Sequence, residues 1–337
     1  MPLLQRVSWS TAIAIGVAIA ALAGPAHAQP KNFPNKPVRF VTTGPGSQND
    51  LLARLITAKL SESWGQPVVI ENRTGAGGAV AASTVAKAAP DGYTLLLQSS
   101  QFAIGAAIHK NLPYDAARDF AGVTQLGFST NALIVAPSLG VKSVKDFIAF
   151  AQARPQVLYS SAGAGSGTHM NGAKFGLAAG IKTQHVGFKG SPDAVIEVVT
   201  ARIHYCVCPL GPALPFIKDG RALALAVAQS QRSPLLPDVP AMPEAIPGYQ
   251  RDGSFMLLAP AGTPRPVLNQ ISKDVARVLA LPEINERLQA MGFVPAPTTP
   301  EELDRILRAD IATFSKVGRI VGLIAPAQPE AQAAKGR

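Results

Sequence analysis

The sequence is poor in cysteine and histidine, and its charges form no concentrated patch. It has 2 cysteines and 5 histidines in 337 residues, with no His/Cys spacing typical of a zinc site. Lys and Arg outnumber Asp and Glu by 31 to 21, but the basic residues are scattered and no basic cluster is interleaved with aromatics. A solvated basic surface explains this charge. We therefore expect no metal site and no nucleic-acid partner.

The two cysteines, Cys206 and Cys208, are two positions apart on a predicted strand. Residues i and i+2 of a strand share a face, with Cα atoms near the upper limit for a disulfide. A bridge between them would be strained, and buried free thiols are tolerable in an exported protein. The sequence leaves both states open.

The first 28 residues have the pattern of an export signal. Arg6 precedes an apolar run over 11–23, and Ala26-His27-Ala28 fits a small-x-small cleavage site. The run is too short to span a membrane, and no longer apolar run follows it. We expect cleavage near Ala28 and a mature protein outside the cytoplasm, in the periplasm.

The mature chain of about 309 residues predicts two domains. Strand and helix patterns alternate, which is typical of an α/β fold with mostly parallel sheets covered by helices. The predicted strands include 68–71, 94–98, 134–136, 157–161, 185–188, 203–207, 223–228 and 255–259. The predicted helices include 79–88, 144–153, 193–201, 214–218, 267–281, 283–291 and 300–318.

The segment 38–54 predicts a buried strand, a turn of small residues and then a helix. Gly44–Gly46 interrupts the strand. Ser47 and Asn49 are candidate N-caps, and Ser47-x-x-Asp50 is a capping-box pattern. The helix has an apolar face, formed by Leu51, Leu52, Leu55, Ile56 and Leu60. A helix that begins over the end of a strand offers free N–H groups, which attract a carboxylate or phosphate without a basic side chain.

A second glycine-rich turn, at 161–167, repeats this pattern. A strand ends, small residues turn, and a helix begins with Ser166 or Thr168 as its cap and Met170, Ala173, Leu177 and Ala178 predicted on its buried face. If the two turns face each other, they form a two-sided site for an anion. Taken alone, the pattern is more often that of two ordinary strand–helix turns.

Nucleotide and catalytic motifs are not met at either turn. Neither turn has the lysine of a P-loop, and both lack the third glycine of a dinucleotide turn, where Asn49 and Thr168 stand instead. His169 near Ser166 resembles a nucleophile–base pair, but no nucleophile elbow with a downstream acid supports it, and a structural or capping role is favoured. We expect no enzyme activity and no cofactor.

Seven short motifs, in order along the chain, resemble the extracytoplasmic solute receptors of tripartite tricarboxylate transporters, often called Bug proteins. The motifs are WGQPVVIENRTGAGG at 64–78, APDGYTLLL at 89–97, LPYD at 112–115, FKG at 188–190, LPFIK at 214–218, RSPLLPDVP at 232–240 and LAPAGTP at 258–264. The resemblance covers essentially the whole mature chain. It implies a two-domain, Venus-flytrap periplasmic-binding-protein fold.

The resemblance also implies domain limits, a ligand class and a binding site. One domain would combine 31–124 with 251–325, and 125–250 would form the other, with hinge crossings near Thr124 and Tyr249. A small di-, tri- or aromatic carboxylate would bind between them and pass to the membrane subunits of the transporter. We expect a monomer. The implied ligand contacts are Gly46, Ser47, Gln48, Asn49, Asp50, Ser99, Ser100, Ala162, Gly163, Ser166, Gly167, Thr168, His169 and Lys189.

Departures from the family pattern bear on the ligand. The first turn usually has three glycines before Thr-Asp, but here Gly46 is followed by Ser-Gln-Asn-Asp. Ala173 and the strand around Cys206 and Cys208 stand where the family often offers acids. A ligand with an essential ammonium group would lack a counter-ion, so we expect a carboxylate without one. A sensing receptor that docks on a signalling partner is the alternative to transport.

Overall fold

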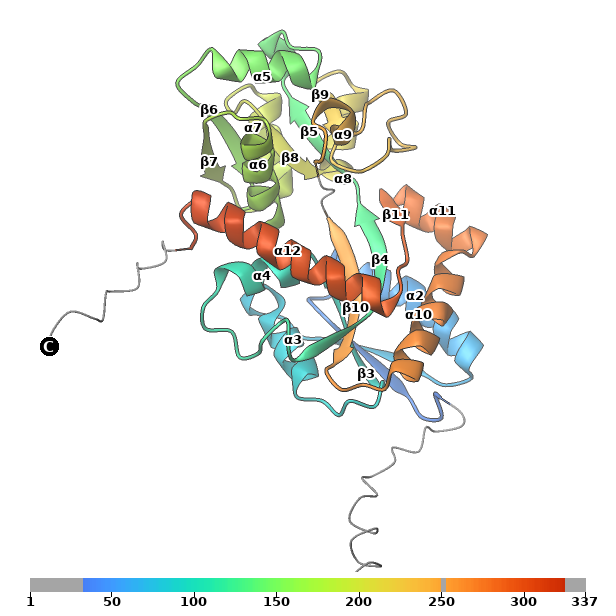
Figure 1. Ribbon diagram of the computed structural model, residues 1–337. Helices are drawn as coiled ribbons and strands as arrows, with labels where there is room; N and C mark the ends of the chain where they lie inside the picture. Colours follow the sequence, from blue (N-terminus) through green and yellow to red (C-terminus); the bar gives the residue numbers. More distant parts are fainter. Residues whose placement is uncertain (1–32, 250–252, 325–337) are drawn as a thin grey trace, which may run out of the picture. The chain divides into compact units, whose positions relative to one another are not determined.

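The computed structural model describes residues 33–249 and 253–324 (Figure 1). The chain divides into two units, residues 1–35 and 36–337, and the second contains all the helices and strands given below. The signal segment expected at 1–28 lies outside the described residues. Within those residues no helix is both long and apolar enough to cross a membrane.

Strands and helices alternate along the second unit. The strands are β1 (Val38–Thr42), β2 (Val68–Asn72), β3 (Thr94–Ser99), β4 (Phe120–Ser129), β5 (Asn131–Val135), β6 (Val157–Ser161), β7 (Thr183–Gly187), β8 (Cys206–Pro209), β9 (Leu223–Val227), β10 (Ser254–Pro260) and β11 (Phe293–Pro295). The helices are α2 (Gln48–Trp64), α3 (Ala79–Ala86), α4 (Gln101–Ile108), α5 (Val144–Gln152), α6 (Gly167–Ala178), α7 (Ser191–Val199), α8 (Leu210–Lys218), α9 (Met242–Ala245), α10 (Arg265–Leu279), α11 (Pro282–Ala290) and α12 (Pro300–Ile320), with short 3-10 turns at Ala76–Gly78 and Pro137–Leu139. Most predicted elements are confirmed. The strand expected at 203–207 forms later, as β8, and helix α4 was not predicted.

The strands of the described residues form three sheets. A six-stranded sheet has the order β11-β4-β10-β3-β1-β2, a three-stranded sheet has the order β8-β5-β9, and β6 pairs with β7. The expectation of mostly parallel sheets is wrong. Only the pairs β1–β2, β1–β3 and β6–β7 are parallel among the described strand pairs, whereas β10 and β4 run antiparallel to their neighbours, as β5 does to β8 and β9.

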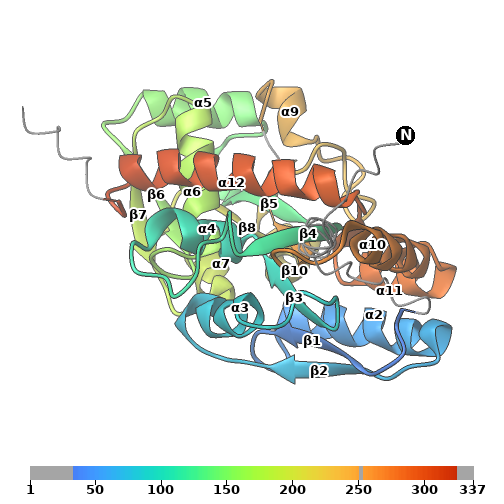
Figure 2. The ribbon, with the colours of Figure 1, turned by 60° about the horizontal axis from the view of Figure 1, so that its bottom comes forward.

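Helices cover both faces of the six-stranded sheet. Figure 1 shows α2, α10 and α11 on one side and α3 and α4 on the other. Helix α2 packs on β1, β2 and β3 and touches α10, while α12 lies across β4 and α4 and reaches α6 (Figure 2). Because β1 runs parallel to β2 and to β3, the carboxyl ends of these three strands lie at one edge of the sheet, where the turns into α2, α3 and α4 begin.

The sequence explains why α2 begins and ends where it does. The hydroxyl of Ser47 accepts a hydrogen bond from the N–H of Asp50 and caps the first turn, and Gly65 ends the helix with a left-handed φ of 62°. Residues Leu52, Ala53, Ile56, Thr57 and Leu60 lie on the buried face. Leu51, expected on that face, is exposed because the stripe is shifted by one position.

Helix α6 is held by an aromatic cluster beneath it. The rings of Tyr159 and Tyr205 stack with centroids 5.4 Å apart, and the Tyr205 hydroxyl donates a 2.9 Å hydrogen bond to the Gly172 carbonyl. A Cβ at Gly172 would collide with the Tyr159 ring, so only glycine lets the ring approach. Phe175 completes the buried face, whereas Leu177 and Ala178, which were predicted on it, are exposed. This packing fixes the start of α6.

The two cysteines are buried free thiols on β8. Cys206 lies opposite Ile134 and Cys208 opposite Ala132 on the neighbouring strand β5, and all four belong to one apolar cluster. Burial, together with the neighbouring Cys208 thiol, raises the pKa of the Cys206 thiol. The Cys206 thiol therefore stays protonated, and both buried cysteines serve as small apolar side chains.

Candidate functional site

The two glycine-rich turns have the same construction. Gly46 and Gly165 adopt left-handed φ angles of 73° and 74°. Each is followed by a serine N-cap, Ser47 or Ser166, whose hydroxyl accepts from the N–H three residues on at 3.2 Å. Ser47 was one of two predicted caps of α2 and Ser166 one of two of α6, and both predictions are confirmed.

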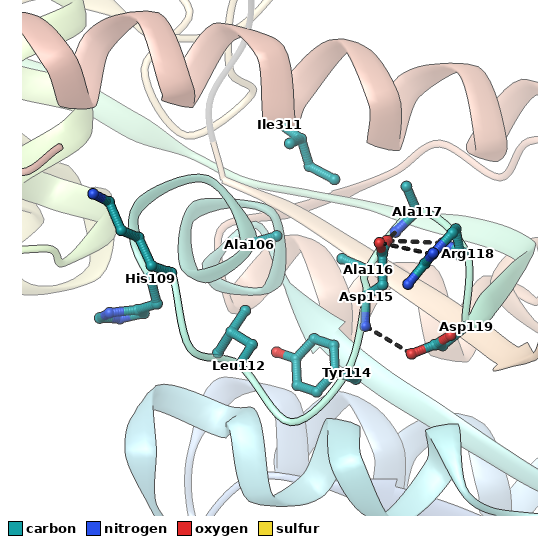
Figure 3. Close-up of a pocket in the computed structure, with 11 residues that line it drawn as sticks. Ala106, His109, Leu112, Tyr114, Asp115, Ala116, Ala117, Arg118, Asp119 and Ile311 are labelled. Atoms are coloured by element: carbon teal, nitrogen blue, oxygen red, sulfur yellow. Dashed lines mark hydrogen bonds and ion pairs between the residues drawn. The ribbon is translucent and has the colours of Figure 1, made fainter. Parts of the chain in front are cut away.

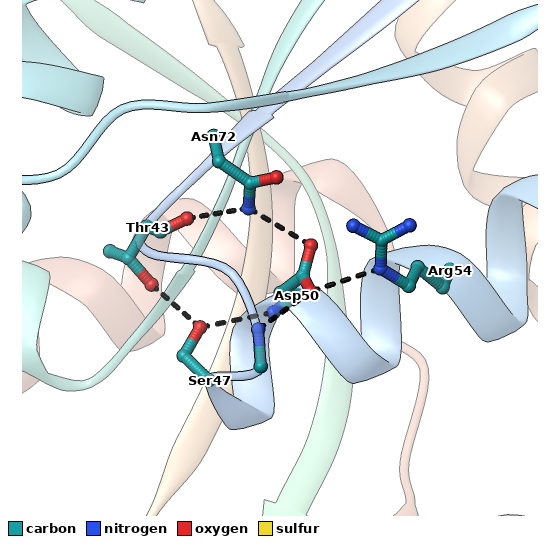
Figure 4. A network of polar contacts seen from close by, with 6 residues as sticks. Thr43, Ser47, Asp50, Arg54 and Asn72 are labelled. Carbon is teal, nitrogen blue, oxygen red and sulfur yellow. Dashed lines mark hydrogen bonds and ion pairs between the residues drawn. The ribbon is translucent and has the colours of Figure 1, made fainter.

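In the first turn, Asp50 is the residue whose N–H bonds to the cap Ser47. Asp50 is buried, and its carboxylate already accepts hydrogen bonds from the protein (Figure 4). It accepts hydrogen bonds from the Gly46 N–H at 2.9 Å, Arg54 Nε at 3.0 Å and Asn72 Nδ2 at 2.9 Å. Burial alone would raise the pKa of Asp50, but the bonds from Arg54, Asn72 and Gly46 lower it. Asp50 is therefore an ionised capping residue whose oxygens are committed to the protein.

In the second turn a neutral histidine takes the place of that aspartate. His169 Nδ1 accepts from the Gly165 N–H at 3.0 Å, which puts the proton of the neutral ring on Nε2. Its ring stacks on His185 with centroids 3.7 Å apart. Burial, and the neighbouring His185, lower the pKa of His169 to about 4. The sequence-based preference for a capping histidine is confirmed by this geometry.

A hollow of about 500 Å³ opens beside the first turn, at the carboxyl ends of β1 and β3. The first turn contributes Asn49 to its wall, and the end of β3 contributes Gln98 and Ser99. Its full lining is Thr43, Gly44, Asn49, Thr74, Gly75, Ala76, Gly77, Gly78, Gln98, Ser99 and Gln101. The wall is uncharged, so its binding groups are backbone N–H groups, hydroxyls and carboxamides.

Gln98 lies against the backbone of the 75–78 turn. Its Nε2 donates to the Gly78 carbonyl at 3.2 Å, and a Cβ at Gly78 would collide with this amide. Gln98 Oε1 and Asn49 Oδ1 are buried and have no hydrogen-bond partner in the described part of the chain. Two buried acceptors in the wall of one hollow are unusual, because such groups are nearly always paired.

Gln101 links the hollow to the second turn. It is the first residue of α4 and lines the hollow, and its Nε2 donates to the Gly165 carbonyl at 3.3 Å. Ile108 at the other end of α4 also lies close to Gly165. The two turns are therefore connected through one helix, although residues of the second turn are not part of the lining.

The other predicted contacts are distributed around these turns. Gln48 donates to the Ser129 hydroxyl at 3.2 Å, and the N–H of Ser100 donates to the Ser254 carbonyl at 2.7 Å. Lys189 lines a different hollow, with Asp193 and Glu197, and is not brought to the first turn.

Within the second turn, two predicted N–H groups are already used. The N–H of Ala162 donates to Thr168 Oγ1 at 2.8 Å, and that of Gly163 to Ser161 Oγ at 3.0 Å. The N–H groups of Gly167 and Thr168 belong to the first turn of α6, where no intrahelical acceptor exists, as for Gln48 and Asn49 in α2. These are the backbone donors that each turn can offer to an anion.

Sequence reasoning missed Gln98, Gln101 and the 74–78 turn as parts of the site. Gln98 had one available signal, since it ends a predicted strand, where ligands of α/β sheets bind. Gly75–Gly78 was predicted as a turn into a helix but was not connected with the first turn.

A further hollow of about 510 Å³ lies at the 106–119 segment beside Ile311 (Figure 3). Both of its carboxylates are engaged within the segment, because Asp119 accepts from the Asp115 N–H at 2.7 Å and Arg118 pairs with the Asp115 carboxylate at 2.9 Å. It contains none of the predicted site residues. Among the described residues there is also no group of three or more His, Cys, Asp or Glu arranged to hold a metal.

Comparison with known proteins assigns the family. The model of the tripartite tricarboxylate transporter family receptor matches residues 52–324. Protein BugT of Bordetella pertussis is 31% identical over 315 residues, covering 92% of this chain and 96% of BugT.

Two solved structures are similar over nearly their whole length. The Rpa4515 protein of R. palustris, solved with adipate, is 33% identical with a TM-score of 0.69, covering 86% of this chain and 98% of that one. MatC of Rhodopseudomonas palustris, solved with bound malate, is 30% identical with a TM-score of 0.65, covering 85% and 99%. The expected α/β fold of periplasmic binding proteins is confirmed. The chain belongs to the tripartite tricarboxylate transporter family of receptors, the Bug-type solute-binding proteins.

Proposed function

We propose that this protein captures a small carboxylate between its two glycine-rich turns and delivers it to a tripartite tricarboxylate transporter. The observation that carries the proposal is the shared construction of the turns. Each opens a helix whose first N–H groups are free of intrahelical acceptors, and each has a glycine, Gly46 or Gly165, that keeps side chains out of the bend. Such helix ends bind anions through backbone dipoles.

The ligand class follows from the chemistry of the hollow. Its uncharged wall suits a carboxylate held by N–H groups, and two family members were solved with the dicarboxylates adipate and malate. The carboxylate of Asp50 is committed to Gly46, Arg54 and Asn72, so it does not serve an ammonium group. An unpaired ammonium would be costly to bury. The ligand is therefore a di-, tri- or aromatic carboxylate without an essential ammonium.

The sheet arrangement supports two domains around the ligand. Strands from 38–129 and 254–295 share one sheet, and strands from 131–227 form the other two. The expected limits, 31–124 plus 251–325 for one domain and 125–250 for the other, cut through β4, which continues to Ser129 in the six-stranded sheet. We therefore assign 31–129 plus 251–325 to one domain and 130–250 to the other, with the first crossing at Thr130. The second crossing lies near Tyr249.

The proposal also includes where the protein acts and which membrane proteins it binds. The protein acts in the periplasm as a monomer, after cleavage near Ala28, and docks in its ligand-bound form on the membrane subunits. It binds its ligand without turnover, because the described residues that line the hollow do not include an acid, a base and a nucleophile together.

The binding proposal is tested with purified protein. Thermal shift screening of di-, tri- and aromatic carboxylates, followed by calorimetry, should give one saturable site and return the ligand intact. Replacing Gln101 by Ala should weaken binding, since it removes the link between hollow and second turn, whereas replacing the exposed Gln289 on α11 should not. Failure of every carboxylate to bind would contradict the proposal.

Delivery is tested in cells. Uptake of the labelled ligand should require both this receptor and the transporter subunits. Uptake that persists after deletion of the receptor gene, together with ligand-dependent binding to a sensor protein, would instead identify a sensing role.

A further inference from the structure

Gln98, which lines the hollow beside the first turn, has an acceptor oxygen whose orientation is fixed by its surroundings. The side chain of Gln98 is 1% exposed. Its amide nitrogen faces the Gly78 carbonyl at 3.2 Å, and a carbonyl can only accept, so the oxygen is on the other side of the amide. That oxygen, Oε1, has no partner among the described residues.

A second acceptor lies in the same wall. Asn49 is 8% exposed, its Nδ2 donates to the Thr43 hydroxyl at 3.0 Å, and its Oδ1 likewise has no partner in the described part of the chain. Asn49 and Gln98 come from different elements, α2 and β3, and both line the hollow. The hollow therefore combines backbone donors at the start of α2 with two unpaired acceptors.

We propose, resting on the carboxylate-binding function above, that the ligand of this protein is a carboxylate that also carries a hydroxyl group, and that Gln98 Oε1 accepts the hydroxyl proton. Asn49 Oδ1 is the acceptor for a second donor of the same ligand. The carboxylate and the hydroxyl of the ligand bind to different parts of the wall. The N–H groups at the start of the helix favour the negatively charged carboxylate, whereas the carbonyl oxygens repel it.

Electrostatics excludes the two simpler occupants of the Gln98 position. An ionised carboxylate oxygen there would face a carbonyl oxygen without a proton between them. An ammonium group could donate a hydrogen bond, but the Asp50 carboxylate beside the turn is committed to other donors. The positive charge of the ammonium would therefore remain unpaired. A hydroxyl supplies the proton without the charge.

The test compares carboxylates that differ by one hydroxyl. Calorimetry with the wild-type protein would use malate and succinate, 2-hydroxyadipate and adipate, citrate and tricarballylate, and 4-hydroxybenzoate and benzoate. An acceptor left unpaired by the analogue predicts a preference of about tenfold or more for the hydroxylated member of the pair that binds. Equal binding of both members, or tighter binding of the member without a hydroxyl, overturns the inference. If no compound of any pair binds, the carboxylate-binding function itself fails.

A matched pair of variants assigns the preference to Gln98. Gln98→Leu removes the acceptor and should bring the ratio of the two dissociation constants to within about twofold of one. Gln125→Leu is the control. Gln125 is also buried, and its Nε2 also donates to a backbone carbonyl, that of Ala296. Its Oε1 also has no partner among the residues that the structure describes, but Gln125 lines a different hollow. The control should keep the wild-type ratio.

Circular dichroism would check that both variants fold. If Gln98→Leu is unfolded, Gln98→Met repeats the test with a more flexible side chain. A folded Gln98 variant that keeps the full hydroxyl preference would refute the assignment.

Discussion

Lowering the pH should destabilise the protein through His169. Its ring is 3% exposed, stacks on His185 and accepts a hydrogen bond from the Gly165 N–H through Nδ1. Protonation would put a donor where that acceptor is needed and a charge where water is scarce. Burial, and the neighbouring His185, therefore hold the pKa of His169 at about 4, below its ordinary value of 6.5.

The direction and size of the effect follow from proton linkage. Between pH 6.5 and 4 the unfolded chain binds a proton at His169 that the folded chain does not, so stability is lost as the pH falls through this window. At 1.36 kcal/mol per pKa unit the difference corresponds to about 3 kcal/mol. Relaxation of the folded chain around the charged ring, which gives protein interiors a higher effective dielectric constant than dry protein, reduces the expected loss to about 2 kcal/mol.

Urea unfolding followed by circular dichroism between pH 4 and 7.5 measures this loss. His169→Gln keeps an acceptor for the Gly165 N–H but cannot titrate, so its unfolding free energy should fall less than that of the wild type, by about 2 kcal/mol at pH 4. Carboxylates that titrate in the same range are common to both proteins and cancel. His109→Gln, at an exposed position, should follow the wild type. Parallel pH profiles of His169→Gln and the wild type would refute the reasoning.

Three more perturbations test the construction of the site. Ser47→Ala and Ser166→Ala should each lower the unfolding free energy by about 1 kcal/mol, because each removes an N-cap, and urea midpoints that do not move would contradict the capping roles. Gly78→Ala should weaken ligand binding, measured by calorimetry, more than Gly77→Ala. Both glycines have positive φ, but only a methyl group at position 78 meets the Gln98 amide. Equal effects of the two substitutions would mean that backbone strain alone, and not contact with Gln98, weakens binding. Small-angle scattering should show a smaller radius of gyration with saturating ligand, since a ligand that touches both turns favours the closed state, and an unchanged radius would count against closure.

Local signals predicted the turns well. The caps Ser47 and Ser166 follow from short-range rules, because a serine before an apolar run satisfies N–H groups of its own helix. That the two turns form one site was a hypothesis from their repeated pattern and from the family resemblance, and it remains part of the proposed function.

Helix α4 shows why part of the site was missed. Its sequence, Gln101–Ile108, is apolar nearly all round, so it lacks the periodicity of an amphipathic helix, and no side chain caps its start. Gln101 was therefore not recognised as the residue that joins the hollow to Gly165.

The pairing of the strands could not be predicted from the sequence either. Strand β10 comes from the C-terminal part of the chain but inserts between β3 and β4, and this makes the sheet mixed. Alternating apolar residues indicate a strand and its buried face, but they do not indicate which strand lies beside it or in which direction. Likewise, the orientation of the Gln98 amide depends on Gly78, twenty residues earlier.

The Gln101–Gly165 hydrogen bond affects how the protein without ligand is divided between different arrangements of its domains. In the proposed two-domain arrangement this bond crosses the domain boundary, so it forms in one arrangement of the domains and breaks in another. A net worth of about 1 kcal/mol shifts such an equilibrium about fivefold. When only part of the molecules are competent to bind, the apparent affinity falls by that fraction. The single carboxamide of Gln101, at the wall of the hollow, can therefore set how tightly this receptor binds, because it sets the fraction of molecules that are competent to bind.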